Sequence, residues 1–380
     1  MSLVNNKRLT QTFLDLVSID CESYQEKEMA TFLKEKLDAL QIPYFEDNAS
    51  EFLKGENSAN NLYCVLKGNL SEKENMEKAI LFSSHMDTVK PGIGKKAIVH
   101  ADGKITSDGT TVLGADDGAG LAEILEMLTI LIENNLPHPD IEILFASAEE
   151  PYCQGSRYVD YSKFHAKKAY VLDLSGEIGR AANAAPSIYS LYIKVKGKSS
   201  HAGFAPEQGV HALYIASKAI ASLPYGSVEE GTTINIGTVQ GGRGKNIVPD
   251  EVSLSGEVRS MFKEKAEYWI EQMKQTFEKQ AKLLNGTVEF VVEKEFDAYF
   301  VDEQEEVSQL FKLACENLGL KSTLLQTFGG SDNNNINPHG IKGLVLANAM
   351  NEVHSVREWT SIQDMSLCVD ILLQIIKLSC

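Results

Sequence analysis

The segment T-T-V-L-G-A-D-D-G-A-G-L-A-E-I-L, residues 110–125, places two adjacent carboxylates, Asp116 and Asp117, ahead of a long apolar run. From Leu121 to Ile132 the apolar residues recur with helical spacing, which predicts an amphipathic helix that begins after Gly120. An aspartate at a helix start commonly caps free backbone N–H groups and complements the helix dipole. This interpretation accounts for one aspartate and leaves the second without a role.

The segments on both sides of these aspartates alternate between strands and helices. Apolar residues with helical spacing predict helices at about 9–17 and 28–40, and short apolar runs predict strands. The predicted strands are Asn61–Lys67, Ala79–Ser84, Asp140–Ser147 and Ala169–Leu172. This alternation predicts an α/β domain with a mixed, largely parallel sheet and helices on both faces.

Residues with metal-binding side chains follow these strands directly: His85, Asp87, Glu149, Glu150 and Asp173. In such sheets, sites form beyond the carboxyl ends of the strands. Adjacent acids are often merely solvated, and a lone H-x-D is weak evidence for a metal. This many acids at one sheet edge, however, would repel one another without a cation. Histidine and carboxylate ligands without cysteine suit Zn²⁺, Co²⁺ or Mn²⁺, and metal pairs serve hydrolysis.

A second domain is predicted from about Ser187, where the pattern changes. Residues 188–196 alternate with period two, as expected for a half-solvated antiparallel strand. The following segments read β-α-β-β-α-β, the order of a ferredoxin-like motif. We therefore predict a discontinuous catalytic domain, residues 1–185 and 297–380, and an inserted lid and dimerisation domain, residues 186–296.

The composition excludes several classes of partner. The formal net charge is −17, and such an acidic surface repels nucleic acid and anionic membranes. No apolar stretch is long enough to cross a bilayer, and no signal peptide is visible. The six cysteines are scattered without metal-binding spacing, which predicts reduced thiols in a cytoplasmic protein.

Five motifs together resemble the co-catalytic dizinc exopeptidase superfamily, which includes peptidase T, carboxypeptidase G and the aminoacylases. They are H-M-D-T-V (85–89), G-A-D-D-G-A-G (114–120), A-S-A-E-E (146–150), V-L-D (171–173) and the late His354. The sequence looks most like peptidase T, although Gly118 stands where that group usually has lysine. The resemblance implies an α/β catalytic domain with an inserted lid.

The resemblance also implies a role for each residue of these motifs. Asp116 would bridge two Zn²⁺ ions with its carboxylate, and the peptide bond between Asp116 and Asp117 would be cis. Co²⁺ or Mn²⁺ could substitute for Zn²⁺. His85 and Asp173 would complete one metal shell, and Glu150 and His354 the other. Glu149 would be the general base that activates a metal-bridging hydroxide, and Asp87 would orient His85.

Weaker motifs match the lid and the pocket of the same superfamily. In G-K-S-S-H-A-G (197–203), His201 would donate a hydrogen bond to the oxyanion of the tetrahedral intermediate. Asn246 and Arg259 would hold a substrate carboxylate, the arginine through its bidentate fork. Gly329 and Gly330 of G-G-S-D-N-N-N (329–335) would line the substrate pocket.

The sequence therefore predicts a zinc-dependent aminopeptidase that removes the N-terminal residue from short peptides, as a tripeptidase does. A deacylase of N-acyl amino acids or a carboxypeptidase of the same superfamily is the alternative, because Arg259 would serve any free carboxylate. A non-catalytic metal- or peptide-binding protein is more remote, since it would be expected to lack the base Glu149. The resemblance also predicts a homodimer formed through the lid domain.

Overall fold

The computed structural model describes residues 2–380 and divides the chain into two compact units. Unit 1 comprises Met1–Ala184 and Phe300–Cys380, and unit 2 comprises Ala185–Tyr299. The boundaries differ little from the predicted ones (184 against 185, and 300 against 297). Among the described residues, no helix combines the length and the apolar character needed to cross a membrane.

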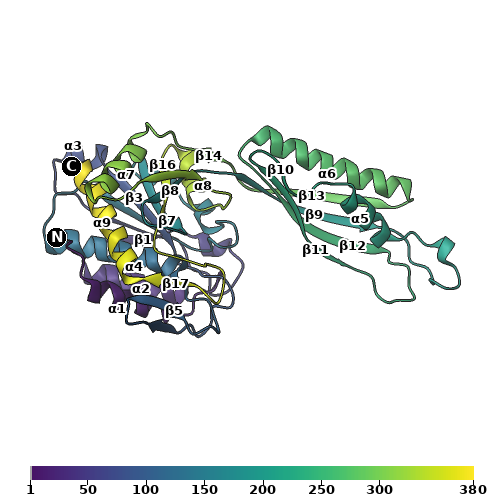
Figure 1. Ribbon diagram of the computed structural model, residues 1–380, viewed down its shortest axis with the longest axis horizontal. Coiled ribbons are helices and arrows are strands. Elements are labelled where there is room, and N and C mark those ends of the chain that lie inside the picture. The colour runs from purple at the N-terminus through teal and green to yellow at the C-terminus, as the bar shows by residue number, and fades with distance from the viewer. Residues whose placement is uncertain (1) are drawn as a thin grey trace. The chain divides into compact units, whose positions relative to one another are not determined.

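A nine-stranded sheet forms the centre of unit 1 (Figure 1). Its order is β1 (Tyr44–Glu46), β2 (Leu62–Leu66), β6 (Ile141–Ala146), β3 (Ile80–His85), β7 (Lys168–Leu174), β16 (Lys342–Ala347), β8 (Arg180–Ala185) and β14 (Tyr299–Phe300), with β15 (Thr323–Gln326) beside β8. The four strands β6, β3, β7 and β16 run parallel to one another. Strands β6 and β3 are buried throughout, as expected for apolar parallel strands covered on both faces. The mixed, largely parallel sheet is confirmed.

The other elements of unit 1 surround this sheet. The helices are α1 (Asn6–Val17), α2 (Lys27–Ala39), α3 (Glu72–Glu77), α4 (Ala115–Glu133), α7 (Glu306–Asn317), α8 (Asn333–Ile336) and α9 (Ile362–Ser379). A small sheet joins β17 (Trp359–Ser361), β5 (Lys104–Ser107) and β4 (Ala97–Val99). Helix α4 contacts β3 and β7, and α1 and α9 pack against α4. This packing places α4 between the sheet and two outer helices.

Helix α4 differs from the predicted helix in its start and in its burial. Its assigned range starts at Ala115, but the backbone angles of Asp116 and Asp117 are not helical, so the regular helix starts at Gly118 rather than after Gly120. Nearly every residue from Ala115 to Leu131 is buried, so the helix is not amphipathic. The sheet covers one side and other helices cover the opposite side, which explains why both faces exclude water.

Unit 2 is a five-stranded antiparallel sheet with two helices on one face (Figure 1). Its elements are β9 (Ser187–Lys196), α5 (Ala212–Ala221), β10 (Gly226–Glu229), β11 (Thr232–Gly241), β12 (Glu251–Ser260), α6 (Lys263–Leu283) and β13 (Thr287–Phe296). The sheet order is β10-β11-β12-β9-β13. Without β10, this is the strand order of the predicted ferredoxin-like motif, and β10 adds a short edge strand.

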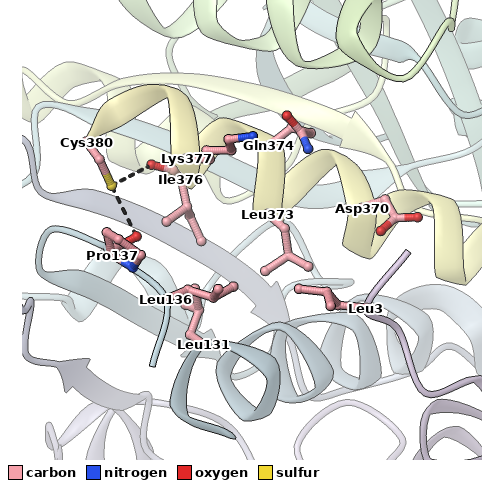
Figure 2. Close-up of a pocket in the computed structure, with 10 residues that line it drawn as sticks. All are labelled: Leu3, Leu131, Leu136, Pro137, Asp370, Leu373, Gln374, Ile376, Lys377 and Cys380. Carbon is pink, nitrogen blue, oxygen red and sulfur yellow. Dashed lines mark hydrogen bonds between the residues drawn. The ribbon is translucent and has the colours of Figure 1, made fainter. Parts of the chain in front are cut away.

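A pocket of about 390 Å³ lies between the C-terminal end of α4 and helix α9 (Figure 2). Its lining is mostly aliphatic and includes Leu131, Leu136, Leu373 and Ile376. None of the predicted site residues lines this pocket. Since Asp116 and Asp117 lie at the opposite end of α4, we treat the pocket as separate from the candidate site.

Candidate metal centre

The strand register brings the predicted ligands to one edge of the sheet of unit 1. Strand β3 ends at His85, which pairs with Ala146 at the end of the parallel strand β6. Glu149 and Glu150 follow β6, and Asp173 lies near the end of β7, the other neighbour of β3. One ligand atom from each of His85, Glu149 and Asp173 lies within 4.8 Å of the others, and the same holds for His85, Asp116 and Glu150. The predicted meeting of these side chains is therefore observed.

Asp116 lies between two histidines that are distant in sequence. Its Oδ1 lies 3.1 Å from His85 Nε2, and its Oδ2 lies 3.3 Å from His354 Nε2. Glu150 Oε2 is 3.0 Å from the same nitrogen of His354, while Asp173 Oδ1 is 4.0 Å from His85 Nε2. Each oxygen of Asp116 thus faces one of the two predicted ligand groups, which is the arrangement that a bridging carboxylate requires.

Asp117 has a different environment from that of Asp116. The peptide bond between them is cis, as the resemblance implied. Asp117 Oδ2 accepts hydrogen bonds from Ser84 Oγ and from the backbone N–H of His85, and Oδ1 accepts from the N–H of Gly120. A Cβ atom on Gly120 would lie 2.5 Å from Asp117 Oδ1, so only glycine permits this close approach. Asp117 therefore joins β3 to the first regular turn of α4, which follows the kink at Asp116 and Asp117.

Asp87 supports the site in two ways. The ring nitrogen His85 Nδ1 lies 3.0 Å from the backbone carbonyl oxygen of Asp87 and 3.4 Å from its carboxylate. The sequence predicted the carboxylate as the partner of this imidazole, whereas the backbone oxygen is the closer one. The carboxylate instead accepts hydrogen bonds from the backbone N–H groups of Glu149 and Glu150, at 2.9 and 3.2 Å, and from Ser23 Oγ. Asp87 thus also fixes the turn that carries both glutamates.

The electrostatics of the cluster fit a bound cation. Burial raises the pKa of Asp173 and of Glu149 well above the ordinary value of a carboxyl group. Hydrogen bonds to Asp116 and Glu150 raise the pKa of His354 to about 10. Glu150 Oε1 is buried and has no hydrogen-bond partner within residues 2–380. Divalent cations would supply the missing positive charge and a partner for this oxygen, and carboxylate and imidazole ligands suit Zn²⁺, Co²⁺ or Mn²⁺.

Glu149 is held differently from Glu150. Its Oε2 lies 4.0 Å from His85 Nε2, and its Oε1 accepts a hydrogen bond from the thiol of Cys153 at 3.2 Å. The two residues that Glu149 contacts, His85 and Cys153, are both buried. The Oε2 atom of Glu149 therefore faces the cluster, while its Oε1 atom accepts the hydrogen bond from the Cys153 thiol.

Sequence reasoning missed three residues that hold the candidate site residues in place. Glu358 accepts hydrogen bonds from the backbone N–H groups of Gly114 and Asp116, both at 2.8 Å. Asn348 donates to the Asp117 carboxylate and to the carbonyl oxygen of Leu172. The third residue is Cys153, whose thiol donates a hydrogen bond to Glu149. Only Glu358 had a visible signal, the H-x-x-x-E spacing from His354.

Unit 2 brings the predicted residues His201 and Asn246 together. The N–H of Ala202 donates to the carbonyl oxygen of Asn246 at 3.0 Å, beside an isolated bridge between His201 and Ile247. The Nδ1 atom of His201 accepts from the N–H groups of Gly203 and Phe204. A neutral imidazole that accepts at Nδ1 carries its proton on Nε2. His201 thus presents an N–H donor from an exposed position, which suits its predicted role.

Arg259 has an acidic partner in the structure. Its Nε and Nη2 atoms donate to the two carboxylate oxygens of Glu257, both at 2.9 Å. The two residues lie two apart on β12, so their side chains share one face of the sheet. The bidentate fork that was predicted to hold a substrate carboxylate is therefore occupied by Glu257, and a substrate would have to replace it or bind beside it.

The glycine-rich segment turns its polar side chains inward. Gly329 is exposed and Gly330 is half-buried, whereas Ser331, Asp332 and Asn333 are buried. Burial raises the pKa of Asp332 to about 6, and Asp332 Oδ1 lacks a hydrogen-bond partner among the described residues. The pocket-lining role of the two glycines stays a prediction. The polar residues that follow them pack within unit 1.

Comparisons with known proteins relate this chain to peptidases. The sequence model of the peptidase dimerisation domain matches residues 183–284, and that of peptidase family M28 matches residues 65–205. The crystal structure of a tripeptidase from Staphylococcus aureus is 37% identical, with a TM-score of 0.94 over 99% of each chain. That of the aminopeptidase PepT from Bacillus cereus is also 37% identical, with a TM-score of 0.89 over 99% of each chain. The uncharacterised protein YqjE of Bacillus subtilis is 38% identical over 99% of each chain.

Proposed function

The chain belongs to the peptidase T group of metallo-aminopeptidases, and on this premise we propose that it removes the N-terminal residue from short peptides, with tripeptides as preferred substrates. The observation that carries the proposal is the position of Asp116, with one carboxylate oxygen facing each of two histidines. Around it, burial raises the pKa values of Glu149, Glu150 and Asp173, and a bound cation would offset the cost of their negative charge.

We propose that unit 1 holds two divalent metal ions, with Zn²⁺ as the native metal. His85 and Asp173 would bind one ion, Glu150 and His354 the other, and Asp116 both. Bound ions of this kind polarise a carbonyl group and lower the pKa of water, which is the chemistry that amide hydrolysis needs.

The side chains of the protein supply the remaining functions. Glu149 would act as the general base: it would take a proton from the attacking water and later deliver it to the leaving amine. Asp87 holds the backbone of Glu149 and supports His85. His201 would donate its Nε2 hydrogen to the oxyanion that develops on the scissile carbonyl.

A substrate panel tests the proposed function. The purified enzyme is assayed with tripeptides, dipeptides, N-acetylated tripeptides and N-acyl amino acids. We expect tripeptides with a free amino terminus to be cleaved fastest, releasing the first residue. Equal cleavage of an acetylated tripeptide would contradict an aminopeptidase, and cleavage of acyl amino acids alone would identify a deacylase instead.

We further infer a homodimer that forms through unit 2, supported by the match to the peptidase dimerisation domain. The mass in solution, measured by light scattering after size-exclusion chromatography, should be twice that of one chain. We also infer a cytoplasmic location, which the six free cysteines support, because thiols stay reduced in that compartment.

A further inference from the structure

The side chain of Cys153 contacts Glu149, the proposed general base. Its thiol donates to Glu149 Oε1 at 3.2 Å, and its side chain is 1% exposed. The other oxygen of Glu149 is the one that faces His85. Burial raises the pKa of Cys153 well above that of a free thiol, so the group stays protonated and remains a hydrogen-bond donor.

The backbone fixes this thiol independently of Glu149. Cys153 adopts a left-handed conformation, with φ of +52°, which residues other than glycine adopt only when their surroundings hold them there. Its carbonyl oxygen accepts hydrogen bonds from Asn335 Nδ2 at 3.0 Å and from Ser156 Oγ at 3.2 Å. Asn335 belongs to the glycine-rich segment 329–335, so that segment helps to set the direction of the thiol.

Both of the adjacent glutamates Glu149 and Glu150 lie where they could bind a metal, although only one of them is proposed to act as the base. Glu149 forms a possible metal-binding group with His85 and Asp173, just as Glu150 does with His85 and Asp116. A carboxylate free to rotate could bind a metal through both oxygens and would then be lost as a base. A donor that engages one oxygen prevents this two-oxygen mode.

We propose that Cys153 is a positioning residue that keeps Glu149 as the base by holding Oε1 and leaving only Oε2 toward the metal centre. The inference rests on the proposed hydrolytic function. It also gives the segment 329–335 a role, because Asn335 donates a hydrogen bond to the backbone carbonyl oxygen of Cys153.

The test compares Cys153→Ala, Cys153→Ser and the matched control Cys315→Ala, which removes another buried thiol. In Cys153→Ala we expect kcat for a tripeptide to fall about tenfold with KM nearly unchanged, the effect of losing one hydrogen bond to a charged group. Cys153→Ser keeps an O–H donor and should recover most of this loss, and the control should match the wild type. Equal losses in the serine and alanine variants, or an unchanged kcat in Cys153→Ala, would overturn the proposal.

Two spectroscopic readouts separate positioning from packing. In Co²⁺-loaded enzyme, the visible spectrum should change in Cys153→Ala, because Glu149 gains access to the metal, and should remain as in the wild type in Cys153→Ser. In metal-free enzyme, the infrared S–H band of Cys153, assigned by its absence in Cys153→Ser, should shift on Glu149→Gln. An unshifted band would refute the hydrogen bond. If the wild type cleaved no peptide, the proposed function would fail, and the infrared experiment would still decide the role of the thiol.

Discussion

Asp116 and Asp117 are neighbours in the chain, yet their carboxylates have separate partners. Asp116 faces His85 and His354, whereas Asp117 accepts hydrogen bonds from Ser84, the His85 backbone and the first turn of α4. The N-cap interpretation of the sequence is therefore correct for Asp117 alone, because the N–H of Gly120 donates to it. Asp116 has the position expected of a shared ligand.

The different positions of Asp116 and Glu149 predict different losses on mutation. Asp116→Ala removes the carboxylate between the two histidines and should abolish metal binding together with activity. Glu149→Gln keeps the shape of the site and should retain metal while kcat falls by at least about a hundredfold, the usual scale of general-base catalysis. Metal content by plasma emission spectrometry and tripeptide assays measure both effects. Normal turnover in Glu149→Gln would remove Glu149 from the mechanism.

Among the elements of unit 1, helix α4 connects the candidate metal centre to the buried core. Its N-terminal end carries Asp116 and Asp117, and its buried sides contact the sheet, α1 and α9. Two of its acids lie in this core. Glu126 pairs with Arg8 of α1, through contacts of 2.6 and 2.9 Å. Glu123 is fully buried without a well-formed hydrogen bond, and the thiol of Cys368 on α9 is its polar neighbour.

We expect the burial of Glu123 to make the free energy of unfolding depend on pH. Burial raises its pKa well above the ordinary value of 4.5. The folded state then holds a proton that the unfolded chain releases, so the free energy of unfolding should fall as pH rises above about 4.5. Glu123→Gln removes this titration, and its stability relative to the wild type should increase with pH. Urea unfolding between pH 5 and 8 measures the difference, with the exposed Glu35→Gln as control; parallel curves would contradict the assignment.

At the scale of the whole molecule, the two units divide the proposed work. All five proposed metal ligands belong to unit 1, whereas His201, Asn246 and Arg259 belong to unit 2. Each unit has its own core, and in unit 2 that core packs α5 and α6 against one face of the sheet.

This division predicts where metal removal acts. A ligand that binds only the folded state stabilises it in proportion to the logarithm of its concentration over Kd. Dialysis against a chelator should therefore abolish activity and lower the unfolding temperature of unit 1, and added Zn²⁺ should restore both. Hydrogen exchange should report the loss of protection in β3, β7 and α4, with β9 and β12 unchanged. Equal loss in both units would contradict the assignment of the metal centre to unit 1.

The sequence alone determined the features that depend on local pattern. Apolar runs of period two and helical spacing located the strands and helices, because these patterns decide which segments can bury a face. The candidate site residues His85, Glu149, Glu150 and Asp173 were recognisable because each lies at or just after the end of a buried strand, and the carboxyl ends of parallel strands meet at one edge. The motifs then identified the family.

Only the tertiary structure decided how the partners of these residues are arranged. The burial of α4 on nearly all sides depends on α1 and α9, which no local pattern in residues 115–133 reveals. Glu358 reaches the backbone of Asp116 from 242 residues away, and Asn348 reaches Asp117 from 231. Cys153 has no sequence signal, because its role depends on a left-handed turn that Asn335 and Ser156 hold in place. Such contacts exist only after the chain has brought distant segments together, and so they could not be predicted from residue spacing.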